Sequence, residues 1–341
     1  WSVLARAYRQ TGREEYAAAV LEQLKDFRKA WPMEVYRKKR TANMSFPGDA
    51  WRSIEAAIRM YTVWLPLFYY FRNSPSWDGE GLASYLNGIH DHGVFLYSHL
   101  TRFTRCANWM LMESSALFQL GLLFPEFKKA EKWKERGWRN LCQESCYQFD
   151  HNGIHTERTP VYHLVSLIAV YQGWQLARRN GMECPSYILP ILERGTEFLM
   201  SLIKPDLSLP MIGDADRITL TGRRADRSVF EGMNLSWNPL NLNELRGHFT
   251  KAAMDCNLPD FLYFSSGRKD GRPPSSLDYF FPEAGYFVGR SGWKENDSYL
   301  LVTGVQVERG SNAAHSHRDA GHVEFMFQGE DILTDSGRYL Y

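Results

Sequence analysis

Histidines and carboxylates are concentrated in the segment from Asn312 to Tyr341. It contains His315, His317, Asp319, His322, Glu324 and Asp335. Imidazole changes its protonation near neutral pH and is therefore suited to proton transfer. Imidazole together with carboxylate also forms ligand sets that suit zinc. The segment is a candidate for acid–base chemistry or metal binding, and the alternative is a metal-free surface loop that is rich in histidine.

The pattern around these side chains predicts a strand hairpin that would position them. Residues 322–327 alternate so that one face is apolar and the other can present polar groups. Gly329, Glu330 and Asp331 predict a turn, and a second strand is expected over Ile332 to Thr334. A His-x-His-x-Asp loop precedes this hairpin. Loops held by a rigid sheet are common places for chemistry.

Length and composition exclude few classes of protein. With 341 residues, 44% of them hydrophobic, the chain can bury a large core as one large domain or two ordinary ones. Its 40 basic and 39 acidic residues nearly cancel, so no overall field favours nucleic acid or a membrane surface. No apolar run reaches the roughly 20 residues of a membrane helix. The 11 Trp, 18 Tyr and 20 Phe suit either a sugar-binding cleft or a helical core.

Amphipathic periodicity predicts a succession of helices before about residue 205. The expected helices are 4–12, 14–31, 51–71, 81–100, 108–123, 127–149, 161–180 and 187–203. Such a series predicts an α/α toroid or another helical array. Strand patterns begin at Tyr279, so we predict a helical domain over 1–270 and a β domain over 271–341. The chain opens inside an expected helix and stops in the expected hairpin region, so we expect it to be a fragment.

Six short motifs, in order, carry a resemblance to a known family. They are NWMLME at 108–113, FPEF at 124–127, ERTPVYH at 157–163, PMIGD at 210–214, AGYFVGRSGW at 284–293, and HSH at 315–317 followed by TDSG at 334–337. Together they resemble the heparinase II/III family of polysaccharide lyases. The resemblance implies an α+β multidomain protein, with an N-terminal α/α toroid followed by a C-terminal antiparallel β-sandwich that is truncated here.

The resemblance also implies a reaction and residues for it. Family members cleave uronic-acid-containing polysaccharides by β-elimination, which requires a neutraliser for the carboxylate, a base for C5 and an acid for the leaving oxygen. Asn108 resembles the neutraliser, Tyr162 the acid and His315 the partner base, with the base role left open between Tyr162 and His315. From the residues alone, Asn108 is equally readable as a helix N-cap and Tyr162 as a core aromatic.

Further residues are assigned as contacts to the substrate or to a metal. The expected substrate contacts are Arg105, Trp109, Glu113, Arg158, His163 and Arg318. Trp109 stands where many relatives have histidine, so a second neutralising role must lie elsewhere. His317 and Asp335 resemble two ligands of a structural zinc ion, whose third ligand is expected beyond Tyr341.

Several functional alternatives remain open. Heparan sulfate or heparin is the first expectation for the substrate, with alginate, hyaluronan and a bacterial exopolysaccharide as alternatives. A glycoside hydrolase would need a pair of carboxylates, for which Glu157 and Asp214 are candidates. A non-catalytic glycan-binding protein is the third class. The resemblance suggests a bacterial protein that is periplasmic or secreted, and it leaves the oligomeric state open.

Overall fold

The computed structural model describes residues 1–37, 50–101, 108–215, 263–264, 268–304, 315, 317 and 320–337. The chain divides into two compact units. Unit 1 comprises Trp1–Arg102 and Trp109–Leu141, and unit 2 comprises Phe103–Asn108 and Cys142–Tyr341. Among the described residues, helix α10 ends at Leu202 and the first strand begins at Tyr279. The predicted boundary at residue 270 lies in that interval, whereas the compact units divide the chain elsewhere.

Unit 1 is built from helices. Its elements are α1 (Ser2–Thr11), α2 (Glu14–Ala30), α3 (Met33–Arg37), α4 (Ser53–Arg59), the π-helix η2 (Met60–Trp64), α5 (Leu65–Phe71), α6 (Gly79–His99) and most of α7 (Asn108–Leu123) and α8 (Ala130–Gln148). Gly12 ends α1 in the left-handed conformation, with φ 67°, and its N–H donates to Tyr8 O. The helix predicted over 51–71 is observed as the continuous run α4, η2 and α5.

Aromatic side chains fill the core of unit 1. Trp64, Trp133, Tyr85, Phe71 and Phe95 are all buried. The Tyr85 hydroxyl donates to Trp64 O at 2.8 Å, so its polar atom is satisfied inside the core. Much of the high aromatic content therefore serves packing. None of the helices within the described ranges is both long enough and apolar enough to cross a bilayer.

Helix α9 (Pro160–Arg179) belongs to unit 2, and most of its residues are buried. Thr159 is its N-cap, with Oγ1 accepting the Tyr162 N–H at 3.3 Å. Pro160 occupies the first turn, where its missing N–H costs nothing. These two residues fix Tyr162 in the first turn of α9. Helix α10 (Ile188–Leu202) follows and ends next to the sheet.

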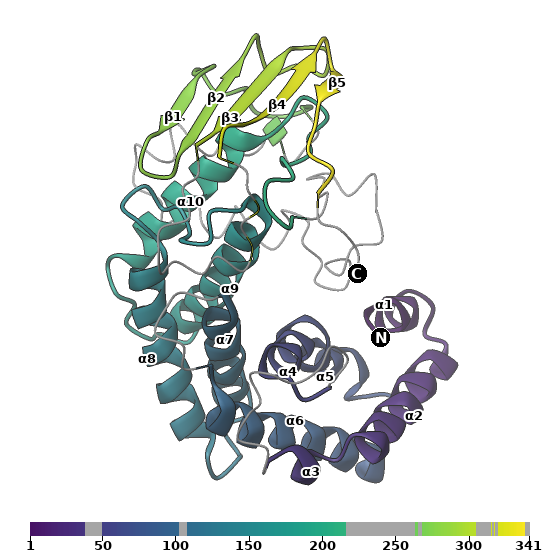
Figure 1. Ribbon diagram of the computed structural model, residues 1–341. Helices are drawn as coiled ribbons and strands as arrows, with labels where there is room; N and C mark the ends of the chain where they lie inside the picture. Colours follow the sequence, from purple (N-terminus) through teal and green to yellow (C-terminus); the bar gives the residue numbers. More distant parts are fainter. Residues whose placement is uncertain are drawn as a thin grey trace. The chain divides into compact units, whose positions relative to one another are not determined.

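The strands that the structure describes form one antiparallel sheet in chain order. They are β1 (Tyr279–Phe281), β2 (Tyr286–Arg290), β3 (Tyr299–Thr303), β4 (His322–Phe327) and β5 (Glu330–Leu333). The sheet is attached to the C-terminal end of α10 (Figure 1). Arg290 donates to Ile203 O at 2.9 Å and to Ser201 O, and the Tyr299 hydroxyl donates to Leu202 O at 3.1 Å. A cation and a hydroxyl thus satisfy carbonyls that a helix end leaves open.

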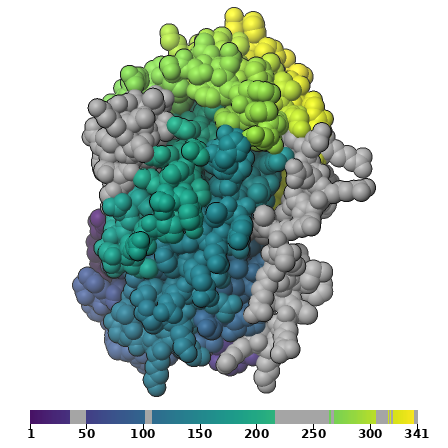
Figure 2. Space-filling model, turned by 90° about the vertical axis from the view of Figure 1, so that its left-hand side faces the viewer, coloured from purple at the N-terminus to yellow at the C-terminus, as the bar shows by residue number. Residues whose placement is uncertain are grey.

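The space-filling view shows the green surface of the sheet adjoining the teal surface of the helices beneath it (Figure 2). The buried face of the sheet is formed by Tyr286, Val288, Tyr299, Leu301 and Met326. Phe198 of α10 packs edge-on against Tyr286, with ring centroids 5.6 Å apart. The sheet is therefore packed on α10, the helix that precedes the segment carrying Asp214.

The predicted hairpin is confirmed, but its turn and the orientation of its faces differ from the prediction. Gln328 and Gly329 form the turn with φ of 52° and 83°, so β5 starts at Glu330 rather than at Ile332. Glu324 is 1% exposed, whereas Phe327 on the opposite face is 51% exposed. The face of β4 that was expected to present polar groups therefore lies inward. The buried Lys204 compensates the charge of Glu324 there, with Nζ 3.3 Å from Glu324 Oε2. The described strands supply one layer of the predicted sandwich.

Candidate active site

Loop 150–159 places Glu157 and leads into helix α9. Asp150 Oδ1 accepts the N–H groups of Asn152 and Ile154, at 2.8 and 2.9 Å, which closes a tight turn. The Glu157 N–H then donates to His155 Nδ1 at 3.3 Å. The loop therefore enters α9 with Glu157 pointing into the protein, where it is 2% exposed.

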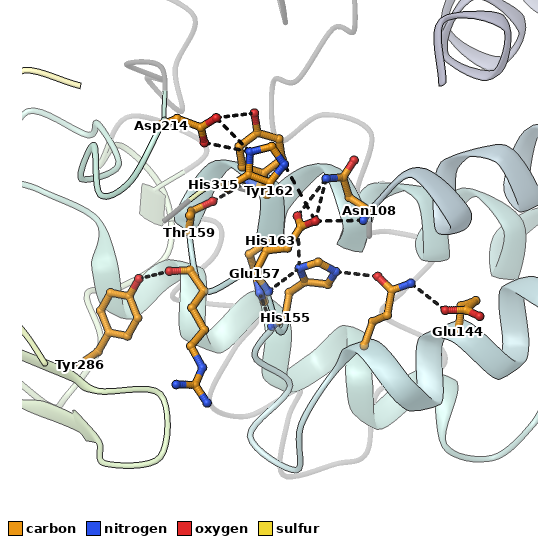
Figure 3. Close-up of polar contacts among 12 residues, drawn as sticks. Asn108, Glu144, His155, Glu157, Thr159, Tyr162, His163, Asp214, Tyr286 and His315 are labelled. Atoms are coloured by element: carbon orange, nitrogen blue, oxygen red, sulfur yellow. Dashed lines mark hydrogen bonds and ion pairs between the residues drawn. The ribbon is translucent and has the colours of Figure 1, made fainter. Parts of the chain in front are cut away.

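Glu157 holds Asn108, the first residue of α7 (Figure 3). Asn108 Nδ2 lies 2.8 and 3.1 Å from the two carboxylate oxygens, and the Asn108 N–H donates to Oε1 at 3.2 Å. Asn108 is only 3% exposed. An N-cap acts through its side-chain oxygen, whereas Asn108 is engaged through its nitrogen. The positive end of a helix stabilises a carboxylate placed there, as Glu157 is at the start of α7. The contacts of both carboxylate oxygens with Nδ2 fix the orientation of the Asn108 amide.

His315 lies between an aromatic ring and a carboxylate (Figure 3). Its ring is stacked on that of Tyr162, with centroids 3.6 Å apart and an interplanar angle of 19°. His315 Nδ1 lies 2.9 and 3.1 Å from the Asp214 carboxylate oxygens. The Tyr162 hydroxyl is 3.4 Å from Asp214 Oδ2. One carboxylate therefore contacts both of the candidate acid–base side chains.

The two groups of contacts meet at Glu157. His315 Nε2 lies 4.0 Å from Glu157 Oε1, the oxygen that also accepts from Asn108. The side chains of His315 and Asp214 are 16% and 24% exposed, so both are partly accessible to solvent. All of these residues belong to unit 2. The structure thus brings together Asn108, Tyr162 and His315, the three residues predicted to carry the chemistry.

Two buried histidines, His155 in loop 150–159 and His163 in the first turn of α9, bind the main chain and side chains around this loop. His163 Nε2 donates to Gly195 O at 2.9 Å, and His163 Nδ1 accepts the His155 N–H at 3.1 Å. His155 Nε2 lies 2.9 Å from Gln148 Oε1. Burial lowers the pKa of His163 to about 4 and that of His155 well below its ordinary value. Both imidazoles are therefore neutral structural groups at physiological pH.

We expect the free energy of unfolding to fall as the pH is lowered from about 6.5 to about 4. The unfolded chain protonates His163 near 6.5, whereas burial holds the folded pKa near 4, so the unfolded state binds more protons in this interval. Above 6.5 His163 is unprotonated in both states, so the stability no longer changes with pH through this residue. The whole fall in the free energy of unfolding between pH 6.5 and pH 4 amounts to about 3 kcal/mol. Urea titrations across this range would measure the slope.

Two histidine variants separate the contribution of His163 from general acid effects. His163→Gln should be less stable at neutral pH but should show a shallower slope below pH 6.5. His151→Gln is the matched control, because His151 is an exposed residue whose ring lies 3.2 Å from Glu283. An undiminished slope in His163→Gln would contradict the assignment of this acid sensitivity.

Glu113 and His163, two of the expected substrate contacts, are both buried and bound within the protein. Glu113 is fully buried in unit 1, where its carboxylate accepts the N–H and the hydroxyl of Thr101 at 2.6 and 2.8 Å. Burial raises the pKa of Glu113 to about 7. His163 is fully buried as well, with both ring nitrogens bound inside the protein. The assignment of these two residues as substrate contacts stays a prediction.

The other expected substrate contacts lie in different surroundings. Trp109 is half-buried in unit 1, where the guanidinium of Arg52 lies over its ring at 5.2 Å. Arg158 has a left-handed backbone, with φ 52°, and its carbonyl accepts a hydrogen bond from the Tyr286 hydroxyl. The assignments of Trp109 and Arg158 stay predictions. Arg105 and Arg318 lie outside the described residues.

The predicted zinc ligands His317 and Asp335 show no shared contact in the described structure. His317 is exposed. Asp335 Oδ1 accepts the Gly337 N–H at 2.7 Å, and Oδ2 lies 3.6 Å from His322 Nε2. Across the described ranges, no group of three or more His, Cys, Asp or Glu side chains is arranged to hold a metal ion. The zinc site, with a third ligand beyond Tyr341, stays a prediction.

Sequence reasoning missed how Glu157 and Asp214 are used. Both were considered only as a carboxylate pair for hydrolysis, yet each binds one of the predicted catalytic residues. Glu157 is 49 residues from Asn108, and Asp214 is 101 residues from His315. Both stand in the motifs ERTPVYH and PMIGD. Helix or strand periodicity cannot show contacts over such separations. The presence of Glu157 and Asp214 in these motifs was therefore the signal in the sequence that could have identified them as functional residues.

Comparison with known proteins places the chain in a family. Residues 1–230 match the family description "Heparinase II/III N-terminus", and residues 273–341 match "Heparinase II/III-like, C-terminal". The heparin-sulfate lyase of Pedobacter heparinus is 26% identical over 343 residues, which cover 100% of this chain and 47% of that protein. The heparin-sulfate lyase of Bacteroides stercoris is 27% identical over 350 residues, covering 99% and 48%. The chain thus spans about half the length of these curated relatives.

Solved structures show the same fold. A crystal structure of heparinase III is similar with a TM-score of 0.75 and 24% identity, over 98% of this chain and 49% of that chain. A mutant of the heparan sulfate lyase HepC from Pedobacter heparinus is similar with a TM-score of 0.67 and 24% identity, over 100% of this chain and 48% of that one. These likenesses confirm the predicted fold class of a helical N-terminal part followed by an antiparallel sheet. The matches over residues 1–230 and 273–341 show that the chain belongs to the heparinase II/III family.

Proposed function

We propose that the full-length protein carrying this chain is a lyase that cleaves a uronic-acid-containing glycan, heparan sulfate or heparin, by β-elimination. The observation that carries the proposal is the contact of His315 with both Tyr162 and Asp214, beside the pair formed by Asn108 and Glu157. The names of the curated relatives support this choice of substrate. The compartment is proposed to be periplasmic or extracellular, where such polymers occur.

β-Elimination breaks a weakly acidic C5–H bond next to a carboxylate. The electrons form a C4=C5 double bond, and the C4–O bond breaks with the electron pair passing to the leaving oxygen. A base takes the C5 proton, and an acid gives a proton to the leaving oxygen, so charge balances. Hydrogen-bond donors aimed at the uronate carboxylate stabilise the negative charge that develops on it.

Asn108 is proposed to supply such a donor. Its Nδ2 carries two hydrogens, and Glu157 holds this nitrogen at 2.8 and 3.1 Å. A carboxylate that shares one N–H between its two oxygens leaves the other N–H for the uronate. The orientation of the amide is fixed before the substrate binds, which lowers the reorganisation needed in the transition state.

His315 is proposed to accept the C5 proton, and Tyr162 to protonate the leaving oxygen. The stacked rings present an imidazole and a phenol on one partly exposed face of the cluster. A phenol is a credible proton donor to an alkoxide-like leaving group, and an imidazole accepts protons near neutral pH. The zinc ion predicted at His317 and Asp335 takes no part in these steps.

The same geometry disfavours glycoside hydrolysis. That reaction needs two carboxyl groups that face the scissile bond from opposite sides. Glu157 is buried and holds Asn108, and Asp214 is engaged by His315. Each carboxylate therefore has a partner within the site. This arrangement favours elimination over hydrolysis. If the full-length protein cleaves no polymer, a non-catalytic glycan-binding protein becomes the favoured alternative.

The experiment that tests the function follows ultraviolet absorbance while the full-length protein is incubated separately with heparan sulfate, heparin, hyaluronan and alginate. Elimination conjugates the new double bond to the carboxylate and raises the absorbance, whereas hydrolysis does not. We expect a rise with heparan sulfate or heparin that is lost in His315→Ala. A rise only with alginate or hyaluronan would overturn the substrate, and reducing ends without absorbance would overturn the reaction.

A further inference from the structure

The main chain of His315 is docked on the turn formed by Gly213 and Asp214. The Asp214 N–H donates to His315 O at 3.1 Å, while the Asp214 carboxylate accepts from His315 Nδ1 at 2.9 Å. Asp214 thus binds the backbone and the side chain of the same residue, 101 positions away. Two such contacts fix both the position and the rotation of the imidazole.

Gly213 makes this docking possible. Its φ is +69°, a conformation that residues with a Cβ adopt at a cost. A Cβ on Gly213 would lie 2.3 Å from His315 O and 2.9 Å from Thr159 Cγ2. Thr159 is the N-cap of the helix that carries Tyr162. A single glycine therefore allows His315 to approach the start of α9, where its ring stacks on Tyr162.

A buried ion cluster anchors the segment that leads to this turn. Lys204 Nζ lies 3.3 Å from Glu324 Oε2 and 2.9 Å from Asp331 Oδ1, with the lysine side chain only 5% exposed. Glu324 Oε1 accepts the Met211 N–H at 3.1 Å. Burial lowers the pKa of Lys204, but the neighbouring carboxylates of Glu324, Asp331 and Asp206 outweigh this effect and raise the pKa overall. The segment before Gly213 is therefore tied to strands β4 and β5 by a charged lysine.

We infer that Gly213 and Asp214 are positioning residues that hold His315 at one place and in one tautomer. A carboxylate only accepts hydrogen bonds, so the Asp214 contact places the imidazole proton on Nδ1. The lone pair then lies on Nε2, the nitrogen on the side of Glu157 and Asn108. The inference rests on the proposed function in one respect, namely that a lone pair on Nε2 is useful as a proton acceptor.

The first test replaces Asp214 by asparagine. The asparagine amide can turn its NH2 group toward Nδ1, which selects the other tautomer and leaves Nε2 protonated. We expect kcat to fall by about 10²–10⁴-fold with a small change in KM. Asp206→Asn is the matched control, because Asp206 lies on the same segment and its carboxylate accepts hydrogen bonds from the N–H and the hydroxyl of Ser208, at 2.9 and 2.5 Å. That control should retain wild-type kcat and the wild-type tautomer.

The tautomer is measured independently of activity by nitrogen-15 NMR of histidine-labelled full-length protein, with the His315 signal assigned by its loss in His315→Gln. We expect an Nδ1–H imidazole in the wild type and a shift toward Nε2–H in Asp214→Asn. An unchanged tautomer in Asp214→Asn would overturn the inference even if the protein is a lyase. If the tautomer changes as expected but no polymer is cleaved by the wild type, the proposed function fails and the positioning role stands.

The second test replaces Gly213 by alanine, with Gly181→Ala as the matched control. Gly181 has nearly the same φ, +68°, but a Cβ there would meet nothing within 4 Å. Both variants pay the backbone cost of a left-handed alanine, so both should unfold at a lower temperature. Only Gly213→Ala should also lose kcat, by about 100-fold. Equal kcat in two folded variants would contradict the positioning role of Gly213.

Discussion

Tyr162→Phe is expected to lower kcat for elimination by about 10²–10⁴-fold with little change in KM, which is the usual contribution of a general acid. The variant removes only the hydroxyl oxygen. The ring remains to stack on His315, and the hydroxyl is 3.4 Å from Asp214 Oδ2, a long contact whose loss costs little stability. Initial rates of absorbance increase at several substrate concentrations would measure kcat and KM separately.

Tyr187→Phe serves as the control for the loss of a tyrosine hydroxyl. Tyr187 donates to Cys142 O at 3.0 Å, away from the cluster around His315. It should unfold at a slightly lower temperature and retain wild-type kcat. If Tyr162→Phe retained wild-type kcat, the Tyr162 hydroxyl would not be the general acid, and another group would have to protonate the leaving oxygen.

Asn108→Ala is expected to lower kcat by about 10²–10³-fold, the usual cost of removing one donor aimed at developing negative charge. Asn108→Asp should be at least as damaging, because it places a second carboxylate beside Glu157 and opposite the uronate. Single-turnover kinetics with heparan sulfate would show whether the loss is in the chemical step. Asn180→Ala is the matched control, because the side chain of this exposed asparagine donates to Leu176 O, at 2.8 Å, at the end of α9.

Glu157→Gln separates the donor from the residue that orients it. Glutamine keeps the shape of the side chain but replaces one accepting oxygen by a donor, so it can no longer hold Asn108 Nδ2 with both arms. We expect about a tenfold loss of kcat in Glu157→Gln alone. When Glu157→Gln is added to Asn108→Ala, we expect kcat to stay at the level of the Asn108→Ala single variant. Additive losses in the double variant would contradict the assignment of Glu157 as a positioning residue for Asn108.

Periodicity was sufficient for the helices because apolar repeats and Gly or Pro breaks are local signals. Helix α7 was predicted and observed over 108–123, and Gly12 closes α1 as expected. The hairpin turn was placed too late because Gln328, an ordinary residue, adopts a left-handed conformation there. The inward orientation of Glu324 depends on Lys204, a residue 120 positions earlier, which strand periodicity cannot show.

Motifs pointed to the candidate catalytic residues, but they did not show which of the neighbouring side chains are buried and bound within the protein. Glu113 and His163 stand in the same motifs as Asn108 and Tyr162, yet both are satisfied internally, by Thr101 and by Gly195 and His155. Asp214 was passed over as a catalytic partner because its relation to His315 exists only after folding. Polar residues in a motif therefore report the site, whereas their roles depend on contacts between distant segments.

The claim that this family member eliminates rather than hydrolyses is tested most directly by the masses of the products. A defined heparan sulfate tetrasaccharide would be digested with the full-length protein and analysed by mass spectrometry. Elimination adds no water, so we predict two fragments whose masses together equal that of the parent, one of them ending in an unsaturated uronate. Fragments whose combined mass exceeds that of the parent by one water would contradict the account.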